Sequence, residues 1–247
     1  MKFPYQGPCE HEKLLAAPAL EAHHVYSGYP GGNRSALKDI SITIAQGMRV
    51  ALVGANGAGK STLLKAIAGL LPIVSGTLKV FGHNVGGCLH QVAYLPQGAA
   101  IDWSFPVSLF DFLLAGRYVH LGWLQYPSKS DRKIVNETLE LLQLVELKNN
   151  SIQHLSGGQK QRALLGRALV HKADLFLLDE PLSAIDARNR HIISIVLDDL
   201  RNKGKTVFMA THDLGGLETD FDNAYFMHDG KQVNSAQWAS KHKMEDS

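Results

Sequence analysis

A glycine-rich loop stands between an apolar strand and a helix, and it constrains the fold of this chain more than any other feature. The loop at residues 54–61 fits the pattern G-x-x-x-x-G-K-[ST] and follows the apolar run at residues 50–53. Its glycines let backbone N–H groups approach phosphate oxygens, and the helix beginning near Lys60 presents the positive end of its dipole. The loop therefore predicts binding of a nucleoside triphosphate.

Short β-rich runs alternate with helical patterns along the chain. Strands are expected at residues 40–45, 49–53, 91–95, 175–178 and 206–210. Helices are expected from Ser61 to Leu71, where Pro72 follows, and over residues 187–202, where the apolar positions share one face. This alternation predicts a parallel α/β architecture.

The middle of the chain differs from the rest. Residues 107–171 contain helical patterns and no convincing strand, which predicts a helical subdomain inserted into the α/β core. Ser108, with Asp111 three residues later, forms a plausible capping box for its first helix. Another helix is expected over residues 131–145, and a third over residues 160–170.

Length, charge and cysteines limit the function classes. The 247 residues suit one large α/β domain with an insertion. Lys plus Arg is 25 and Asp plus Glu is 23, so the net charge of +2 gives no reason to expect nucleic acid as a partner. Cys9 and Cys88 lack metal-ligand spacing and are expected to be free thiols. Because no apolar stretch approaches about 18 residues, we expect a soluble protein, at most peripheral to a membrane.

Two adjacent carboxylates end the apolar run at residues 175–178. Asp179 and Glu180 follow it at the strand's carboxyl end, where α/β sheets hold ligands. Asp179 can orient water bound to Mg²⁺, and Glu180 can polarise the attacking water. Lys60 would neutralise phosphate charge, while Ser61 would hold Mg²⁺.

A second anion site is expected at residues 155–159, before the helical run at 160–170. Ser156, Gly157 and Gly158 stand at this helix N-terminus, and Gln159 follows them. Alone, this pentapeptide is also compatible with an ordinary N-cap and a flexible turn. The pentapeptide favours an anion site over an ordinary N-cap only in combination with the other motifs.

Together the motifs resemble those of the ATP-binding cassette ATPases, the motor subunits of ABC transporters, over about residues 19–233. In family order, the Walker A loop is followed by the Q-loop glutamine Gln97, the signature motif at 155–159, the Walker B strand at 175–180, the D-loop at 183–186 and the switch histidine His212. The resemblance implies a P-loop NTPase core of the ABC ATPase type, with an inserted α-helical subdomain and an N-terminal antiparallel β region. It divides the chain into a tail at 1–18, a core at 19–96 and 172–235, a helical signature subdomain at 97–171, and a tail at 236–247.

The resemblance also implies a head-to-tail homodimer, in which each ATP lies between the phosphate loop of one subunit and the signature motif of the other. Glu180, His212 and Gln97 are expected to be catalytic, and Ser61, Gln97 and Asp179 to bind Mg²⁺. Tyr29 resembles the aromatic residue that stacks on adenine, with Tyr26 as the alternative. Contacts to ATP are expected from Tyr29, Gly54, Asn56, Gly57, Gly59, Lys60, Ser61, Thr62, Ser156, Gly157, Gly158, Gln159 and Asp186.

An aromatic stretch follows Gln97, at residues 101–107 and 116–123. It predicts a docking surface, which in the family receives a short helix from the membrane permease. The alternative is that Trp103, Phe105, Phe110 and Phe112 pack the core of the helical subdomain.

The amino-acid sequence of this stretch resembles that of the manganese, zinc and iron importer branch, although Val119 replaces an expected glycine and residues 109–112 are unusually aromatic. The resemblance implies a peripheral ATPase at the cytoplasmic face of the cell membrane. Its direct partner would be an integral-membrane permease, with an extracytoplasmic metal-binding protein as an indirect one. An iron-chelate importer ATPase and a soluble ABC ATPase that acts outside transport remain as alternatives.

Overall fold

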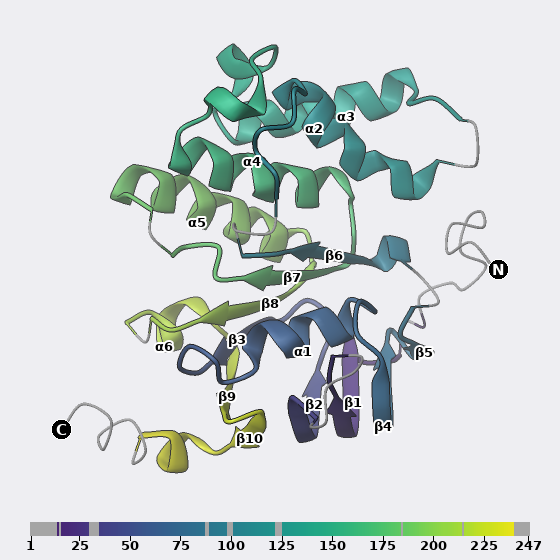
Figure 1. Cartoon of the computed structure of the whole chain (residues 1–247), viewed down its shortest axis with the longest axis vertical. Coiled ribbons are helices and arrows are strands. Elements are labelled where there is room, and N and C mark those ends of the chain that lie inside the picture. The colour runs from purple at the N-terminus through teal and green to yellow at the C-terminus, as the bar shows by residue number, and fades with distance from the viewer. Residues whose placement is uncertain are drawn as a thin grey trace.

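The computed structural model describes residues 14, 16–29, 35–86, 89–97, 101–121, 125–183, 185–213 and 215–239. Two sheets form its scaffold (Figure 1). The antiparallel sheet has the order β2-β1-β4-β5, built from β1 (Leu20–Ser27), β2 (Leu37–Ile44), β4 (Ile73–Val80) and β5 (His83–Asn84). The second sheet has the order β10-β9-β3-β8-β7-β6 and contains β3 (Arg49–Val53), β6 (Val92–Leu95), β7 (Leu175–Asp179), β8 (Thr206–Thr211), β9 (Asn223–His228) and β10 (Lys231–Val233).

The larger sheet is parallel from β9 to β6 and takes an antiparallel edge only at β10. Helices α4 (Gly157–Val170) and α5 (Ala187–Asn202) cover one of its faces. Helix α1 (Lys60–Ile67) lies on the other face, between the two sheets (Figure 1). Helices α2 (Leu109–Leu114), α3 (Lys129–Leu141) and the short α6 (Leu217–Asp220) are further α-helices, with 3-10 turns η1 (Leu89–Gln91), η3 (Ala115–His120), η4 (Val145–Leu147) and η5 (Ile152–His154).

Successive side chains of the buried strands point to opposite faces of the sheet, and this alternation divides the core into two main layers. In β7, Phe176 and Leu178 join the cluster under α4 and α5, while Leu175 and Leu177 join the cluster around α1 and the antiparallel sheet. All four side chains are at most 1% exposed, as a strand covered on both faces requires. The same strand therefore supplies packing surface to the helical subdomain and to the nucleotide core.

The expected parallel α/β fold with a helical insertion and an N-terminal antiparallel β region is confirmed. The strand expected at residues 49–53 and the helix expected at 187–202 have the observed bounds of β3 and α5. Helix α1 ends earlier than expected, because Gly69 adopts a left-handed φ of 74° and its N–H donates to the carbonyl of Ala66. The helix expected at 131–145 is α3, which ends at Leu141.

The helical subdomain is held by caps and by one buried ion pair. Ser108 caps α2 by accepting from the N–H of Asp111, and its hydroxyl donates to Asp111 Oδ2 at 2.6 Å. The expected capping box is therefore only half formed among the described residues, because no bond runs from the Ser108 N–H to Asp111. Ser128 and Asp131 form a full capping box on α3. Asp131 also accepts from Arg117 Nε at 2.8 Å, and Arg117 Nη1 donates to the carbonyl of Val170 at 2.8 Å. This pair ties η3, α3 and the C-terminus of α4 together.

Two parts of the expected tails contact the core. Gln46 Nε2 donates to the carbonyl of Ala17 at 2.7 Å. Trp238 is only 8% exposed and its ring lies 5.5 Å from that of Phe226, so it packs with the core rather than extending from it. Cys9 and Cys88, expected to be free thiols, lie outside the described residues.

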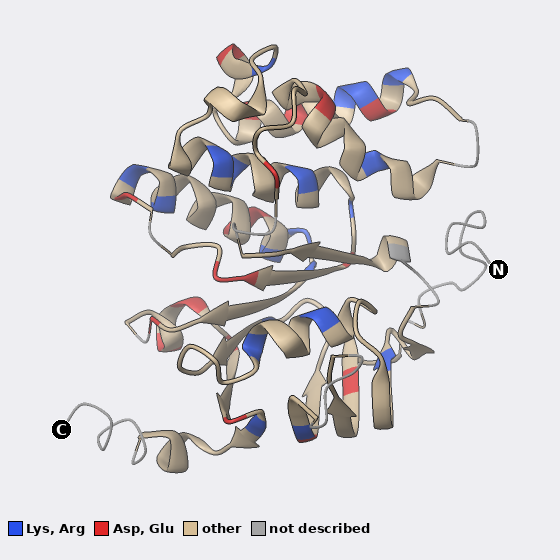
Figure 2. Cartoon of the chain, viewed as in Figure 1, with Lys and Arg blue, Asp and Glu red and all other residues tan. Residues whose placement is uncertain are grey.

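Charged residues of both signs are spread over the two halves of the molecule (Figure 2). Basic residues recur along α4, while acidic residues stand near the carboxyl end of β7. This mixed distribution agrees with the small net charge of +2.

Candidate functional site

A pocket of about 550 Å³ opens at the carboxyl ends of β3, β7 and β8. It brings together residues from four motifs that are far apart in the sequence. The lining consists of Ala55, Asn56, Gly57, Gly59, Lys60, Ser61, Thr62, Gln97, Glu180 and His212. A polyphosphate would therefore meet the loop, the Q-loop glutamine, the second strand-end carboxylate and the switch histidine in one place.

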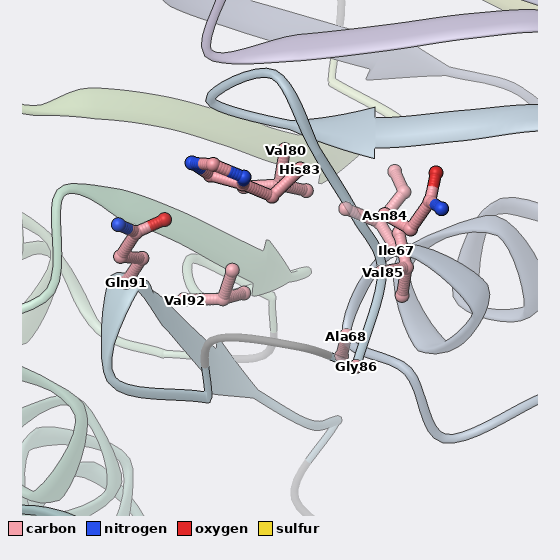
Figure 3. A pocket seen from close by; sticks show the side chains of 9 residues that line it. All are labelled: Ile67, Ala68, Val80, His83, Asn84, Val85, Gly86, Gln91 and Val92. Carbon is pink, nitrogen blue, oxygen red and sulfur yellow. The ribbon is translucent and has the colours of Figure 1, made fainter. Parts of the chain in front are cut away.

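A second hollow lies elsewhere and is too small for a nucleotide. It has a volume of about 30 Å³ and lies beside Ile67, between β4, β5 and β6 (Figure 3). His83, Asn84 and Gln91 supply its polar groups. A space of this size accommodates about one water molecule.

The loop before α1 has the backbone geometry of an anion cradle. Gly57 and Gly59 have φ of 82° and 100°, a left-handed region that side-chain-bearing residues rarely adopt. A Cβ on Gly54 would lie 2.7 Å from the carbonyl oxygen of Met227, so close backbone packing also requires a glycine there. Gly59 is the N-cap of α1 and offers no side-chain cap, which leaves the first N–H groups of this helix to a ligand.

Lys60 is buried beneath this loop. Its Nζ donates to the carbonyls of Gly54 at 2.7 Å and Ala55 at 3.1 Å, and it lies 3.2 Å from Glu180 Oε1. The side chain is 5% exposed. The ammonium group thus lies between the phosphate loop and the Glu180 carboxylate, where it can bind a phosphate in place of its present contacts.

The side chains of Lys60, Gln97 and His212 all lie close to the carboxylate of Glu180. Gln97 Nε2 donates to Glu180 Oε2 at 3.3 Å, and His212 Nδ1 lies 3.7 Å from the same oxygen. The backbone of Glu180 has φ of 52°, an unusual value for a side-chain-bearing residue. Its N–H donates to the carbonyl of Ala210, and the N–H and hydroxyl of Ser183 donate to its own carbonyl. The surrounding structure therefore holds a strained conformation that aims the carboxylate into the pocket.

Asp179 is more deeply buried than Glu180. It is 2% exposed, and Tyr94 OH donates to its Oδ2 at 3.4 Å, whereas its Oδ1 has no hydrogen-bond partner among the described residues. Burial raises the pKa of Asp179, and the neighbouring Glu180 carboxylate adds to this rise, while the nearby Ser61 hydroxyl and the charge of Lys60 oppose it. A buried carboxylate oxygen without a partner, next to a hydroxyl, fits the oxygen ligation of a divalent cation.

The signature segment forms a cap and does not line this pocket. Ser156 is the N-cap of α4, its N–H donates to Gln159 Oε1 at 2.8 Å, and the N–H of Gln159 donates back to Ser156. Asp186 is the N-cap of α5, and its carboxylate is exposed. The surface around Ser156 is therefore available to a second molecule.

Tyr29 also stands outside the pocket lining. It is 50% exposed, and Lys65 Nζ lies 3.4 Å from its hydroxyl and 5.7 Å from the centre of its ring. Tyr94, which donates to Asp179 from the neighbouring strand, was not predicted from the sequence. The available signal was its place as a polar residue near the carboxyl end of the apolar run 92–95.

The aromatic stretch divides between core and surface. Phe110 and Phe112 are buried, and Trp103 packs against the same cluster with its ring 5.7 Å from that of Phe112, so the alternative of core packing is confirmed for these three residues. Phe105 and Tyr118 are more than half exposed. Tyr118 borders a groove of about 1160 Å³ between η3, α4 and β6.

The comparisons with known proteins agree with this geometry. Residues 37–183 match the profile of the ABC transporter family. This chain belongs to the ABC transporter family. It is an ATP-binding subunit, and it is an ATPase. Its α/β core with the helical insertion is thus an ABC ATPase fold.

Curated relatives of this ABC ATPase are subunits of metal transport systems. It is 42% identical over 192 residues to the zinc transport system ATP-binding protein TroB of Treponema pallidum, covering 78% of this chain and 72% of that protein. It is also 42% identical over 193 residues to the manganese transport system ATP-binding protein MntB of Halalkalibacterium halodurans, covering 78% and 77%. The chelated iron transport system membrane protein YfeB of Yersinia pestis is 37% identical over 217 residues, or 87% and 73% of the two chains.

Solved structures share the fold. One is described as an inward-facing metal-chelate type ABC transporter, with a TM-score of 0.75, 28% identity, and coverage of 87% of this chain and 82% of that one. A nucleotide-free ATP-binding cassette from an ABC transporter has a TM-score of 0.78 at 22% identity, over 93% and 98% of the chains. Among the residues described for this ABC ATPase, none of the helices is long and apolar enough to cross a membrane.

Proposed function

We propose that this ABC ATPase is the motor subunit of an importer for a divalent metal ion, with manganese as the first candidate and zinc or iron as the others. It would act at the cytoplasmic face of the membrane through a separate permease, which an extracytoplasmic metal-binding protein supplies. The observation that carries this proposal is the similarity, over about four fifths of the chain, to ATP-binding proteins named for zinc and manganese transport.

Hydrolysis would use the residues gathered around Glu180. Glu180 would align and polarise the attacking water, with His212 and Gln97 near the γ-phosphate, because all three side chains meet within 3.7 Å. Ser61, Gln97 and Asp179 would hold Mg²⁺, and the unpartnered Oδ1 of Asp179 supports this assignment. Mg²⁺ would neutralise charge that develops on the phosphate oxygens. The remaining contacts to ATP would come from Tyr29, Gly54, Asn56, Gly57, Gly59, Lys60 and Thr62.

A second copy would complete the site. Ser156, Gly157, Gly158 and Gln159 lie outside the pocket, and Ser156 and Gly157 are exposed, so a phosphate bound by another subunit can reach them. Asp186 stands exposed at the next helix N-terminus. ATP between two head-to-tail copies would contact both, and its differential affinity for the closed arrangement would drive closure.

The groove beside Tyr118 would receive the permease. Its wall combines apolar side chains such as Leu164 with the cations Lys65 and Arg167, and its described lining includes no acidic residue. An amphipathic segment with an acidic side chain would fit this surface. Pro96 of the same groove adjoins Gln97 in the nucleotide pocket, so the two sites share one short segment.

A second candidate is an importer for chelated iron. The similarity to YfeB and to the metal-chelate type transporter favours it. Uptake assays with Mn²⁺, Zn²⁺, Fe²⁺ and an iron chelate, in a strain lacking the gene, separate the candidates. Loss of manganese uptake alone supports the first, and loss of chelate uptake alone supports the second.

The ATPase assignment is tested by Glu180→Gln, with exposed Glu137→Gln as the control. We expect Glu180→Gln to bind ATP and to lose at least about a hundredfold in turnover, accumulating a closed dimer on a sizing column. Turnover near that of the control would remove Glu180 from its role. Tight ATP binding with no dimer at any protein concentration would contradict the composite site.

A further inference from the structure

One amide side chain connects the signature turn to the D-loop within a single subunit. Asn189 lies in the first turn of α5, three residues after the N-cap Asp186. Its backbone N–H donates to Asp186 Oδ1 at 2.7 Å, and its side-chain Nδ2 donates to Asp186 Oδ2 at 2.8 Å. Both carboxylate oxygens of Asp186 are therefore held by the same residue, which fixes the direction in which this exposed group points.

The same amide packs directly against the backbone of the signature turn at Gly158. A Cβ built on Gly158 would overlap Asn189 Nδ2, and it would lie 2.6 Å from Cγ and 3.0 Å from Oδ1. Gly158 has an ordinary backbone conformation, because its φ is not among the positive values. The glycine is thus required by the close approach of Asn189 and not by an unusual φ.

A second contact joins the same two segments. Gln161 Nε2, one turn into α4, donates to the carbonyl of Pro181 at 3.0 Å. Pro181 directly follows Glu180, whose carbonyl accepts from Ser183. The N-terminal turn of α4 consequently packs against Asn189 of α5 and is hydrogen-bonded to Pro181, which follows β7.

These contacts matter if two elements must reach one nucleotide together. In the proposed dimer, the Ser156 turn and Asp186 of one subunit face the ATP of the other. A composite site tolerates only small errors in the spacing of its parts. The two helices already share one hydrophobic cluster, and the side chains of Asn189 and Gln161 add contacts between their N-terminal ends.

We propose that Asn189 is a positioning residue, which sets the spacing between the Ser156 turn and Asp186 so that both engage the partner subunit's nucleotide as one surface. This inference rests on the proposed head-to-tail dimer. Asn189 acts through its neighbours and touches no nucleotide in its own subunit, because it lies outside the lining of the phosphate-loop pocket.

The first experiment separates binding within one subunit from closure between two. Asn189→Ala is placed in the Glu180→Gln background, with Asn202→Ala, at the exposed far end of the same helix, as the matched control. Affinity of the dilute monomer for a fluorescent ATP analogue is measured first, and the ATP-dependent dimerisation constant second. We expect unchanged monomer affinity, and dimerisation weakened at least about fivefold for Asn189→Ala but not for Asn202→Ala.

The second experiment uses the contact with Gly158 as a double-mutant cycle. Gly158→Ala displaces the Asn189 amide from Asp186 and should abolish dimerisation, whereas the double variant Gly158→Ala with Asn189→Ala removes the overlap. We expect the double variant to dimerise better than Gly158→Ala alone, which a merely additive loss of stability would not produce. The Asn189→Asp variant should dimerise more weakly than the Asn189→Ala variant, because it places a second carboxylate beside that of Asp186.

The outcomes distinguish the inference from the function on which it rests. If Glu180→Gln alone fails to form an ATP-dependent dimer, the composite site is wrong. If it dimerises and Asn189→Ala leaves the constant unchanged, or if the double variant is as defective as Gly158→Ala, Asn189 has no positioning role.

Discussion

Replacing Asp131 by Asn should destabilise the protein in a pH-dependent manner. Asp131 is 6% exposed, and the hydroxyl of Ser128, followed by Arg117, lowers its pKa from 3.8 to about 2 against the opposing effect of burial. At 1.36 kcal/mol for each pH unit, this difference corresponds to roughly 2.5 kcal/mol in favour of the ionised form. We therefore expect Asp131→Asn to lower the free energy of unfolding by about 2 kcal/mol at pH 7.

The sign of the pH dependence follows from linkage. Because the folded pKa lies below the unfolded one, the stabilisation is complete above about pH 5 and is lost as the pH falls towards 2. Urea unfolding between pH 7 and pH 3 should show the gap between wild type and variant narrowing below pH 5.

The matched control is Asp111→Asn. Asp111 occupies the same position after a serine N-cap, with Ser108 Oγ at 2.6 Å from its carboxylate, but it is exposed. Its replacement should cost under about 1 kcal/mol. Equal losses in the two variants at pH 7, or a gap for Asp131→Asn that stays constant on acidification, would refute the role of the buried pair.

Two further predictions concern the core and a buried imidazole. Phe176→Ala should lower the unfolding free energy by roughly 3–5 kcal/mol, since the ring is 1% exposed, and chemical denaturation measures the loss. Burial, followed by the nearby His120 and Arg117, lowers the pKa of His171 to about 4, so NMR titration should find His171 neutral at pH 6. Because this folded pKa lies below the unfolded value, its stabilisation is present above about pH 6.5 and declines towards pH 4.

Local sequence signals predicted the elements that carry the nucleotide site. The buried strand β3 shows a continuous apolar run, and Ser156 stands where a helix N-cap belongs, so both were predictable from neighbouring residues. Strand β4 was not predicted, since most of its side chains are exposed and its place depends on pairing with β1. The positive φ of Glu180 could not be predicted either, because distant backbone partners impose it.

The sequence also could not predict the link through Asn189. An asparagine three residues after an N-cap is unremarkable as a local pattern, and its meaning comes from Gly158, which lies on another helix. The subdomain boundary predicted at residue 171 likewise took no account of contacts between distant parts of the chain. It follows the motif order, whereas the hydrophobic cluster above the sheet includes residues from both sides of it.

That shared cluster has a consequence for how the protein unfolds. Phe176 and Met209 of the sheet pack with Leu113 and Leu165 of the helices, so separating the two parts would expose the side chains of both. The helical insertion should consequently lack independent stability, and a fragment carrying residues 97–171 should fail to fold alone. Hydrogen exchange of deeply protected amides in β7 and α4 should report a single cooperative opening rather than two.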